Sequence, residues 1–242
     1  MTNQDRIYSM PLSRVGDFEF DDSVADVFPD MIRRSVPGYA SMLSMIAQCA
    51  ERYAVPKTNI YDLGCSLGAG TLLLRQHAKT PCQIHAIDNS AAMMTRLQQR
   101  LDESRPSDNA VNPIQSDIRD VAVSDASVVV LNLTLQFLPP EERDTFINKL
   151  AAGTLKGGAL ILSEKICFDD AAQQELMTQL HHDFKRAHGY SDLEIAQKRT
   201  AIENQLLPET LNRHVERLKS AGFRTVSPWF QCFNFASILA VK

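Results

Sequence analysis

The chain of 242 residues lacks most of the features that mark membrane, secreted or metal-binding proteins. No apolar stretch reaches the ~20 residues that a membrane-spanning helix needs. The first residues lack the basic-then-apolar pattern of a signal peptide. The five cysteines are odd in number and include no C-x-x-C pair, which disfavours a disulfide framework or a metal site. We therefore expect a soluble cytoplasmic protein without a metal.

An excess of positive charge is also missing. The chain has 25 Lys and Arg against 29 Asp and Glu, for a net charge of −4. A protein that binds the phosphate backbone of a nucleic acid favours a basic face, so we expect no direct nucleic acid binding. With 44% hydrophobic and 22% charged residues, the composition is that of an ordinary globular protein.

The most informative stretch is NIYDLGCSLGAG, residues 59–70. A short apolar run ends at Asp62, and Gly64 and Gly68 then permit a sharp turn and a close approach of the backbone to a ligand or strand. Ser66 stands where a dinucleotide loop, G-x-G-x-x-G, has its second glycine. No Gly-Lys-Ser/Thr follows either, so the spacing disfavours both a dinucleotide loop and a Walker loop.

The same stretch resembles the first motif of class I S-adenosylmethionine-dependent enzymes, Asp/Glu-x-Gly-x-Gly/Ser-x-Gly. A second apolar run, Gln83–Asp88, predicts the next strand and ends in an acid. A carboxylate about 20 residues beyond such a loop accepts hydrogen bonds from ribose hydroxyls. Together the two stretches predict a nucleoside-binding unit.

The rest of the chain predicts an α/β protein with a three-layer, Rossmann-like methyltransferase fold. Strands alternate with helices, which implies a parallel sheet, and two closing strands predict an antiparallel end to a sheet of about seven strands. We expect a single domain over 1–242, in four parts. These are a helical prefix (1–57), a nucleoside-binding core (58–168), a helical insertion (169–221) and a terminal strand pair (222–242).

Within the prefix, a short helical pattern begins near Asp21, and Pro29-Asp30 and Pro37-Gly38 are typical of turns. A second helical pattern runs from Tyr39 to about Ala54. The prefix could lie over the carboxyl ends of the strands and close the ligand cleft. It could equally pack against the outer face of the sheet.

Ligands of an open parallel sheet bind beyond the carboxyl ends of its strands. Asp88 should therefore hold the ribose, with Asn89 against the sugar or the adenine. Gly64 belongs to the loop that approaches the ligand. Cys65 lies in the same loop, where a small side chain suffices and a reactive thiol is the alternative.

Two later strand ends carry further candidates. Asp117 would accept from the adenine amino group and Ile118 would offer the ring an apolar surface, although Asp117 could instead cap the next helix. Asn132 ends a strongly β-branched strand and could face the reacting centre, or could bond the local backbone. The stretch Asn132-Leu133-Thr134 lacks the Asn/Asp-Pro-Pro-Tyr/Phe pattern of enzymes that methylate amino groups. This difference disfavours a nucleic acid or protein amine as the methyl acceptor.

The insertion holds the densest polar stretch, His181–Tyr190, followed by Gln197-Lys198-Arg199. Paired histidines can indicate a metal, but no carboxylate or cysteine spacing completes a ligand set. A solvated helix face is one alternative. An arginine aimed into the cleft, where guanidinium binds carboxylate bidentately, is the other.

Five stretches together resemble the carboxy-S-adenosyl-L-methionine synthase family, and the resemblance covers nearly the whole chain. Leu133 and His188 depart from it, where phenylalanine and asparagine are expected. The stretches are 27–39, 61–69, 135–138, 181–191 and 229–235.

The resemblance implies an enzyme that carboxylates instead of methylating. It converts S-adenosylmethionine and prephenate into carboxy-S-adenosylmethionine and phenylpyruvate, and a partner tRNA carboxymethyltransferase uses the product at the wobble uridine. The resemblance also implies a homodimer, Arg199 as the cation for the new carboxylate, and Tyr39 as a candidate base. The implied ligand contacts are Tyr39, Gly64, Cys65, Ser66, Asp88, Asn89, Asp117, Ile118, Asn132 and Arg199.

Two other functions stay open for the same fold. A conventional methyltransferase that acts on a small molecule would use the same nucleoside site. A non-catalytic module would bind S-adenosylmethionine without turnover. The loop spacing disfavours a nicotinamide-dependent dehydrogenase.

Overall fold

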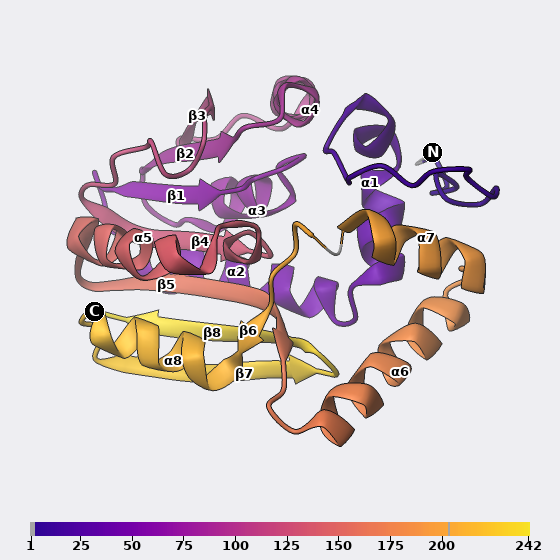
Figure 1. Ribbon diagram of the computed structural model, residues 1–242. Coiled ribbons are helices and arrows are strands. Elements are labelled where there is room, and N and C mark those ends of the chain that lie inside the picture. The colour runs from indigo at the N-terminus through magenta and orange to yellow at the C-terminus, as the bar shows by residue number, and fades with distance from the viewer. Residues whose placement is uncertain (1–2, 203) are drawn as a thin grey trace.

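The computed structural model describes residues 3–202 and 204–242, which form a central sheet with helices on both faces (Figure 1). The strand order is β3-β2-β1-β4-β5-β8-β7. Strands β1 to β5 run parallel to one another, and β8 is antiparallel to both β5 and β7. The expected fold, with an antiparallel last strand, is confirmed. The strands are β1 (Asn59–Leu63), β2 (Gln83–Asp88), β3 (Ala110–Gln115), β4 (Ala126–Asn132), β5 (Thr154–Cys167), β7 (Thr225–Cys232) and β8 (Phe235–Val241).

Strand β4 shows why the sheet is apolar on both faces. Val128 and Val130 pack in a cluster with residues of α2 (Tyr39–Tyr53) and α3 (Ala69–His77). Val129 and Leu131 point the other way, into a cluster that includes α5 (Pro140–Gly153) and α8 (Leu211–Ser220). Helix α4 (Ala91–Glu103) packs on β2 and β3. A strand buried on both faces reads as a continuous β-branched run, as the sequence does here.

Three helices lie beyond the carboxyl ends of the parallel strands (Figure 1). They are α1 (Asp22–Ser35), α6 (Ala171–Ala187) and α7 (Asp192–Ile202). The prefix therefore does both things that its sequence allows, since α1 covers the strand ends and α2 packs on the sheet. Within the described residues, no helix combines the length and apolar character needed to cross a bilayer.

The turn expected at Pro29-Asp30 is wrong, because α1 continues through Pro29. Val24 and Met31, on either side of it, pack in one apolar cluster. Arg34 pairs with Asp30 at 3.1 Å across the following turn. These contacts offset the backbone hydrogen bond that a proline within a helix removes.

Two boundaries near the end of the chain also differ from those expected. The hairpin turns at Phe233-Asn234, later than expected, and β7 passes through Pro228 next to a register shift. Proline is tolerated there because β7 is an edge strand. Two short elements had no signal in the sequence, the 3-10 turn η1 (Leu135–Phe137) and the strand β6 (Glu209–Thr210), which pairs with β5.

Candidate active site

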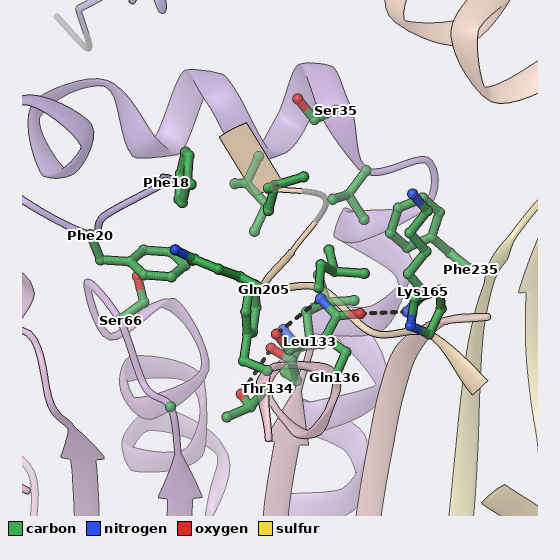
Figure 2. A pocket seen from close by; sticks show the side chains of 18 of the residues that line it. Phe18, Phe20, Ser35, Ser66, Leu133, Thr134, Gln136, Lys165, Gln205 and Phe235 are labelled. Carbon is green, nitrogen blue, oxygen red and sulfur yellow. Dashed lines mark hydrogen bonds between the residues drawn. The ribbon is translucent and has the colours of Figure 1, made fainter. Parts of the chain in front are cut away.

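A cavity of about 990 Å³ lies beyond the carboxyl ends of β1 to β5, between the sheet and the helices α1, α6 and α7 (Figure 2). This volume is at the upper end of the ~300–1,000 Å³ typical of ligand pockets. Every site residue expected from the sequence lines it. They are Tyr39, Gly64, Cys65, Ser66, Asp88, Asn89, Asp117, Ile118, Asn132 and Arg199.

The backbone of the glycine loop is fixed next to the Asp88 carboxylate. Gly64 has φ +78°, and a Cβ there would meet the side chain of Thr134 at 2.4 Å, so only glycine fits. The Ser66 N–H donates to Asp88 Oδ2 at 2.9 Å, and the Ser90 N–H donates to Oδ1 at 2.9 Å. Burial raises the pKa of Asp88, although these backbone donors act in the opposite direction. The carboxylate is thus fixed in place at the cavity wall.

Two residues near this loop are structural. Asp62 accepts a 2.6 Å hydrogen bond from the Thr71 hydroxyl, which ties the end of β1 to the start of α3. Burial raises the pKa of Asp62 to about 6. Cys65 is also buried, and its burial raises the pKa of the thiol. A protonated thiol is a poor nucleophile, so the structure disfavours a reactive cysteine here.

Asp117 does not cap a helix, since no helix follows it in the structure. Its carboxylate accepts hydrogen bonds from the backbone N–H, Nε and Nη2 of Arg119, at 2.7–2.9 Å. The Arg119 hydrogen bonds lower the pKa of Asp117. The neighbouring Ile118 is buried and lines the cavity, so an anionic acceptor and an apolar surface lie side by side.

Asn132, at the end of β4, has a buried side-chain oxygen with no hydrogen-bond partner among the described residues. Leu133 follows in the left-handed region, at φ +64°, which turns the chain sharply at the cavity wall. Buried polar atoms are nearly always paired in folded proteins. An orphaned amide oxygen at a cavity therefore indicates a position that a ligand satisfies.

Tyr39, the first residue of α2, is a poor candidate for a base. Burial, then the nearby Asp62 charge, raises the pKa of Tyr39 to about 12. Its phenol thus stays protonated near neutral pH. A hydrogen bond donated from this hydroxyl is the role that its environment favours.

The opposite wall is rich in cations, most of which the sequence reasoning missed. Arg199 lines the cavity from α7, and burial, with the Arg199 charge as a further cause, lowers the pKa of both Lys165, on β5, and Lys185, on α6. Lys198 also lines it. Lys165 could have been found from the sequence, because the strand-end rule that gave Asp88 and Asn132 applies equally to the fifth strand.

The first of the paired histidines, His181, has partners within the protein. His181 Nε2 lies 2.8 Å from the Ser35 carbonyl, and its ring packs edge-on against Phe235. Burial lowers the pKa of His181, so the ring is neutral. Across residues 3–202 and 204–242, no group of three or more His, Cys, Asp or Glu could hold a metal ion.

The fold and the cavity have counterparts among known proteins. The family model "Methyltransferase domain" matches residues 60–158. Magnesium protoporphyrin IX methyltransferase from Synechocystis PCC 6803 superimposes with a TM-score of 0.58 at 16% identity, over 98% of this chain and 88% of that one. Human N-acetylserotonin methyltransferase superimposes with a TM-score of 0.60 at 16% identity, over 91% and 55%. The chain thus has the class I S-adenosylmethionine-dependent methyltransferase fold.

Relatives that match over the whole chain identify a narrower family than the shared fold does. The carboxy-S-adenosyl-L-methionine synthase of Vibrio vulnificus (strain YJ016) is 54% identical over 242 residues, which cover 100% of this chain and 98% of the relative. That of Aliivibrio fischeri (strain ATCC 700601 / ES114) is 54% identical over 243 residues, or 100% of both. The chain belongs to the carboxy-S-adenosyl-L-methionine synthase family.

Proposed function

We propose that this protein converts S-adenosylmethionine and prephenate into carboxy-S-adenosylmethionine and phenylpyruvate. The observation that carries the proposal is that one cavity joins strand-end carboxylates to a wall of cations from β5 and the insertion. Carboxylates suit the hydroxyls of a nucleoside, and cations suit an acid. Membership of the synthase family supports the same reaction.

In this proposal the nucleoside lies along the ends of β1, β2 and β3. Asp88 accepts from the ribose hydroxyls, and Asn89 lies beside the sugar. The adenine ring rests on Ile118, and its amino group donates to Asp117. The backbone of residues 64–66 lies close to the rest of the ligand, as glycine at the turn allows.

The reaction needs a carbanion equivalent and carbon dioxide in the same closed space. The positive sulfur acidifies the methyl group of S-adenosylmethionine, and loss of a proton gives an ylide. As the prephenate ring becomes aromatic, its ring carboxylate leaves as carbon dioxide. Its ring hydroxyl leaves as hydroxide, which takes the methyl proton and becomes water. The ylide carbon then bonds to carbon dioxide before it escapes, an effect of proximity and water exclusion.

This route needs no base from the protein, in accord with the raised pKa of Tyr39. The new carboxylate needs a cation, and Arg199 is our candidate because guanidinium binds carboxylate through two parallel hydrogen bonds. Asn132, whose amide oxygen has no partner within the described residues, lies near the reacting end.

We also propose that the chain acts as a single domain with its prefix, core, insertion and terminal strands together, and that it forms a homodimer. Its product would serve a tRNA carboxymethyltransferase that modifies the wobble uridine, without this protein binding the tRNA itself. The net charge of −4 is consistent with a protein that does not bind the tRNA itself. The five free cysteines are consistent with a reducing, cytoplasmic location.

The first test is the mass of the small molecule released from freshly purified protein, followed by turnover with prephenate. We expect a species heavier than S-adenosylmethionine by one carbon dioxide, and phenylpyruvate formed in step with it. A labelled methyl group that appears on another acceptor without prephenate would instead identify a conventional methyltransferase. Tight binding of S-adenosylmethionine without turnover of any acid would identify a non-catalytic module.

A further inference from the structure

Lys165 is placed by the sheet beside the reacting end of the cavity. In the pairing of β4 with β5, Asn132 lies opposite Ser163. Lys165 continues past Ser163 on the same face of β5, because side chains alternate along a strand. Figure 2 shows its side chain rising from the end of β5 alongside Phe235. The ammonium group thus lies further out along the cavity than the amide of Asn132.

Lys185 approaches the same wall from α6, and the charges around both lysines have one sign. Burial and the Arg199 charge lower the pKa of Lys165. Burial, then Lys198, Lys165 and Arg199, lowers the pKa of Lys185 to about 7. In residues 3–202 and 204–242, neither ammonium group has a carboxylate within ion-pair distance or a hydrogen-bond acceptor.

Lys198 shows what a structural lysine in this region looks like. Its ammonium lies 3.9 Å from Asp5 and 3.2 Å from the Ser35 hydroxyl. Asp5 also accepts from the Tyr190 hydroxyl, so this lysine belongs to a network that fastens the start of the chain to α7. Across the part of the chain that the structure describes, Lys165 and Lys185 have no such network. A poorly solvated cation without a counter-charge is unfavourable, and an anionic ligand removes the penalty.

Apolar and neutral rings complete the wall. The His181 and Phe235 ring centroids are 5.1 Å apart at an angle of 78°, and both residues line the cavity. His181 is neutral, as its lowered pKa requires. A ring-bearing acid could therefore lay its carbocycle on these groups and direct its carboxylates to the lysines.

From this arrangement, we propose that Lys165 and Lys185 form a second subsite of the cavity that binds a dicarboxylic acid with a carbocyclic ring. The inference rests on the proposed function, in which prephenate is that acid, and assigns residues to its binding. Each lysine binds the acid's carboxylates, whereas Arg199 is reserved for the carboxylate added to the product. The cavity volume leaves room for both ligands at once.

The test separates binding from turnover. Prephenate is titrated calorimetrically into protein saturated with S-adenosylhomocysteine, which lacks the methyl group and cannot react. Variants Lys165→Met and Lys185→Met keep the length of the side chain and remove the charge. Lys165→Arg restores the charge, and Lys156→Met, at the exposed opposite end of β5, is the matched control.

We expect each Met variant to weaken prephenate binding tenfold or more, with the affinity for S-adenosylhomocysteine unchanged within twofold. Lys165→Arg should recover most of the lost prephenate affinity, and Lys156→Met should bind prephenate like the wild type. The Met substitutions should weaken binding of the monocarboxylate phenylpyruvate less than binding of prephenate. Folded Met variants that bind prephenate like the wild type would overturn the inference. If the wild type binds prephenate but never carboxylates S-adenosylmethionine, the proposed function fails and the subsite stands.

Discussion

Asp88 and Lys165 both lie near the carboxyl ends of strands in one sheet, but their surroundings differ. The Asp88 carboxylate is held by two backbone N–H groups of the neighbouring loops. Among the described residues, the Lys165 ammonium has no ion-pair or hydrogen-bond partner, and burial together with the Arg199 charge lowers its pKa. The nucleoside half of the cavity is therefore preorganised by the protein alone. In our proposal the ligand supplies the missing counter-charge of the cationic half, so the affinity of that half should depend more strongly on ligand charge and on pH.

The largest effect should come from breaking the preorganised half. We expect Asp88→Ala to raise the Kd for S-adenosylmethionine about a hundredfold or more, because two hydrogen bonds to a charged acceptor contribute ~1.5–3 kcal/mol each. Calorimetry on the purified variant measures this. Prephenate binding to the cationic half should change much less. A Kd within threefold of the wild type would remove Asp88 from the ribose site.

The second test is directed at the opposite half. Arg199→Ala should weaken carboxy-S-adenosylmethionine about ten- to a hundredfold, the range for a charge-assisted bidentate contact. S-adenosylmethionine, which lacks the added carboxylate, should bind almost as before. Arg186→Ala is the control, since Arg186 pairs on the surface of the insertion with Asp183 and Asp192. Equal weakening of both ligands would contradict the role of Arg199.

The two halves also differ in how far the sequence predicted them. Asp88 follows from a local rule, an acid at the end of the strand after a glycine loop, and the structure places it as expected at the cavity. The fold follows from the alternation of strands and helices for the same reason, since each element carries its own periodicity.

The cationic half depends on contacts between distant segments. Lys185 lies on α6, which packs against α1, where His181 contacts the Ser35 carbonyl at 2.8 Å. The turn η1 is likewise held from a distance, by Glu164, whose carboxylate accepts from the N–H groups of Leu135 and Gln136 at 2.9 Å. No local pattern encodes such pairs. A resemblance to a family could supply Arg199 but not the lysines.

The third prediction uses pH to separate the halves. Lys185, with a pKa of about 7, faces Lys165, Lys198 and Arg199, and it loses its proton as the pH rises. Prephenate affinity should therefore be highest below pH 7 and fall by up to about tenfold by pH 8.5, since loss of one charge contact to a carboxylate is of that order. Lys185→Met should flatten this fall. Calorimetry in buffers of constant ionic strength measures it.

Over the same pH range the nucleoside half should behave differently. Burial raises the pKa of Asp88, the carboxylate proposed to hold the ribose. This carboxylate takes up a proton more readily than an ordinary aspartate as the pH falls, so the affinity for S-adenosylhomocysteine should weaken toward acidic pH, the direction opposite to the prephenate effect. Two ligands with the same pH profile would contradict the division of the cavity into two halves.

The smallest expected effect concerns the adenine, where a structural and a ligand-binding role of one residue must be separated. Asp117 holds Arg119 through three hydrogen bonds, and this ion pair is partly exposed. Such pairs contribute ~0–1 kcal/mol to stability.

We therefore expect Arg119→Ala to change the Kd for S-adenosylmethionine by less than about threefold. Asp117→Asn, which loses the anionic acceptor for the adenine amino group, should raise it about three- to tenfold, as a neutral hydrogen bond replaces a charged one. If both variants weaken binding equally, Asp117 acts only by positioning Arg119 and its loop. If only Asp117→Asn does, the acid contacts the adenine, as the nucleoside half of the comparison requires.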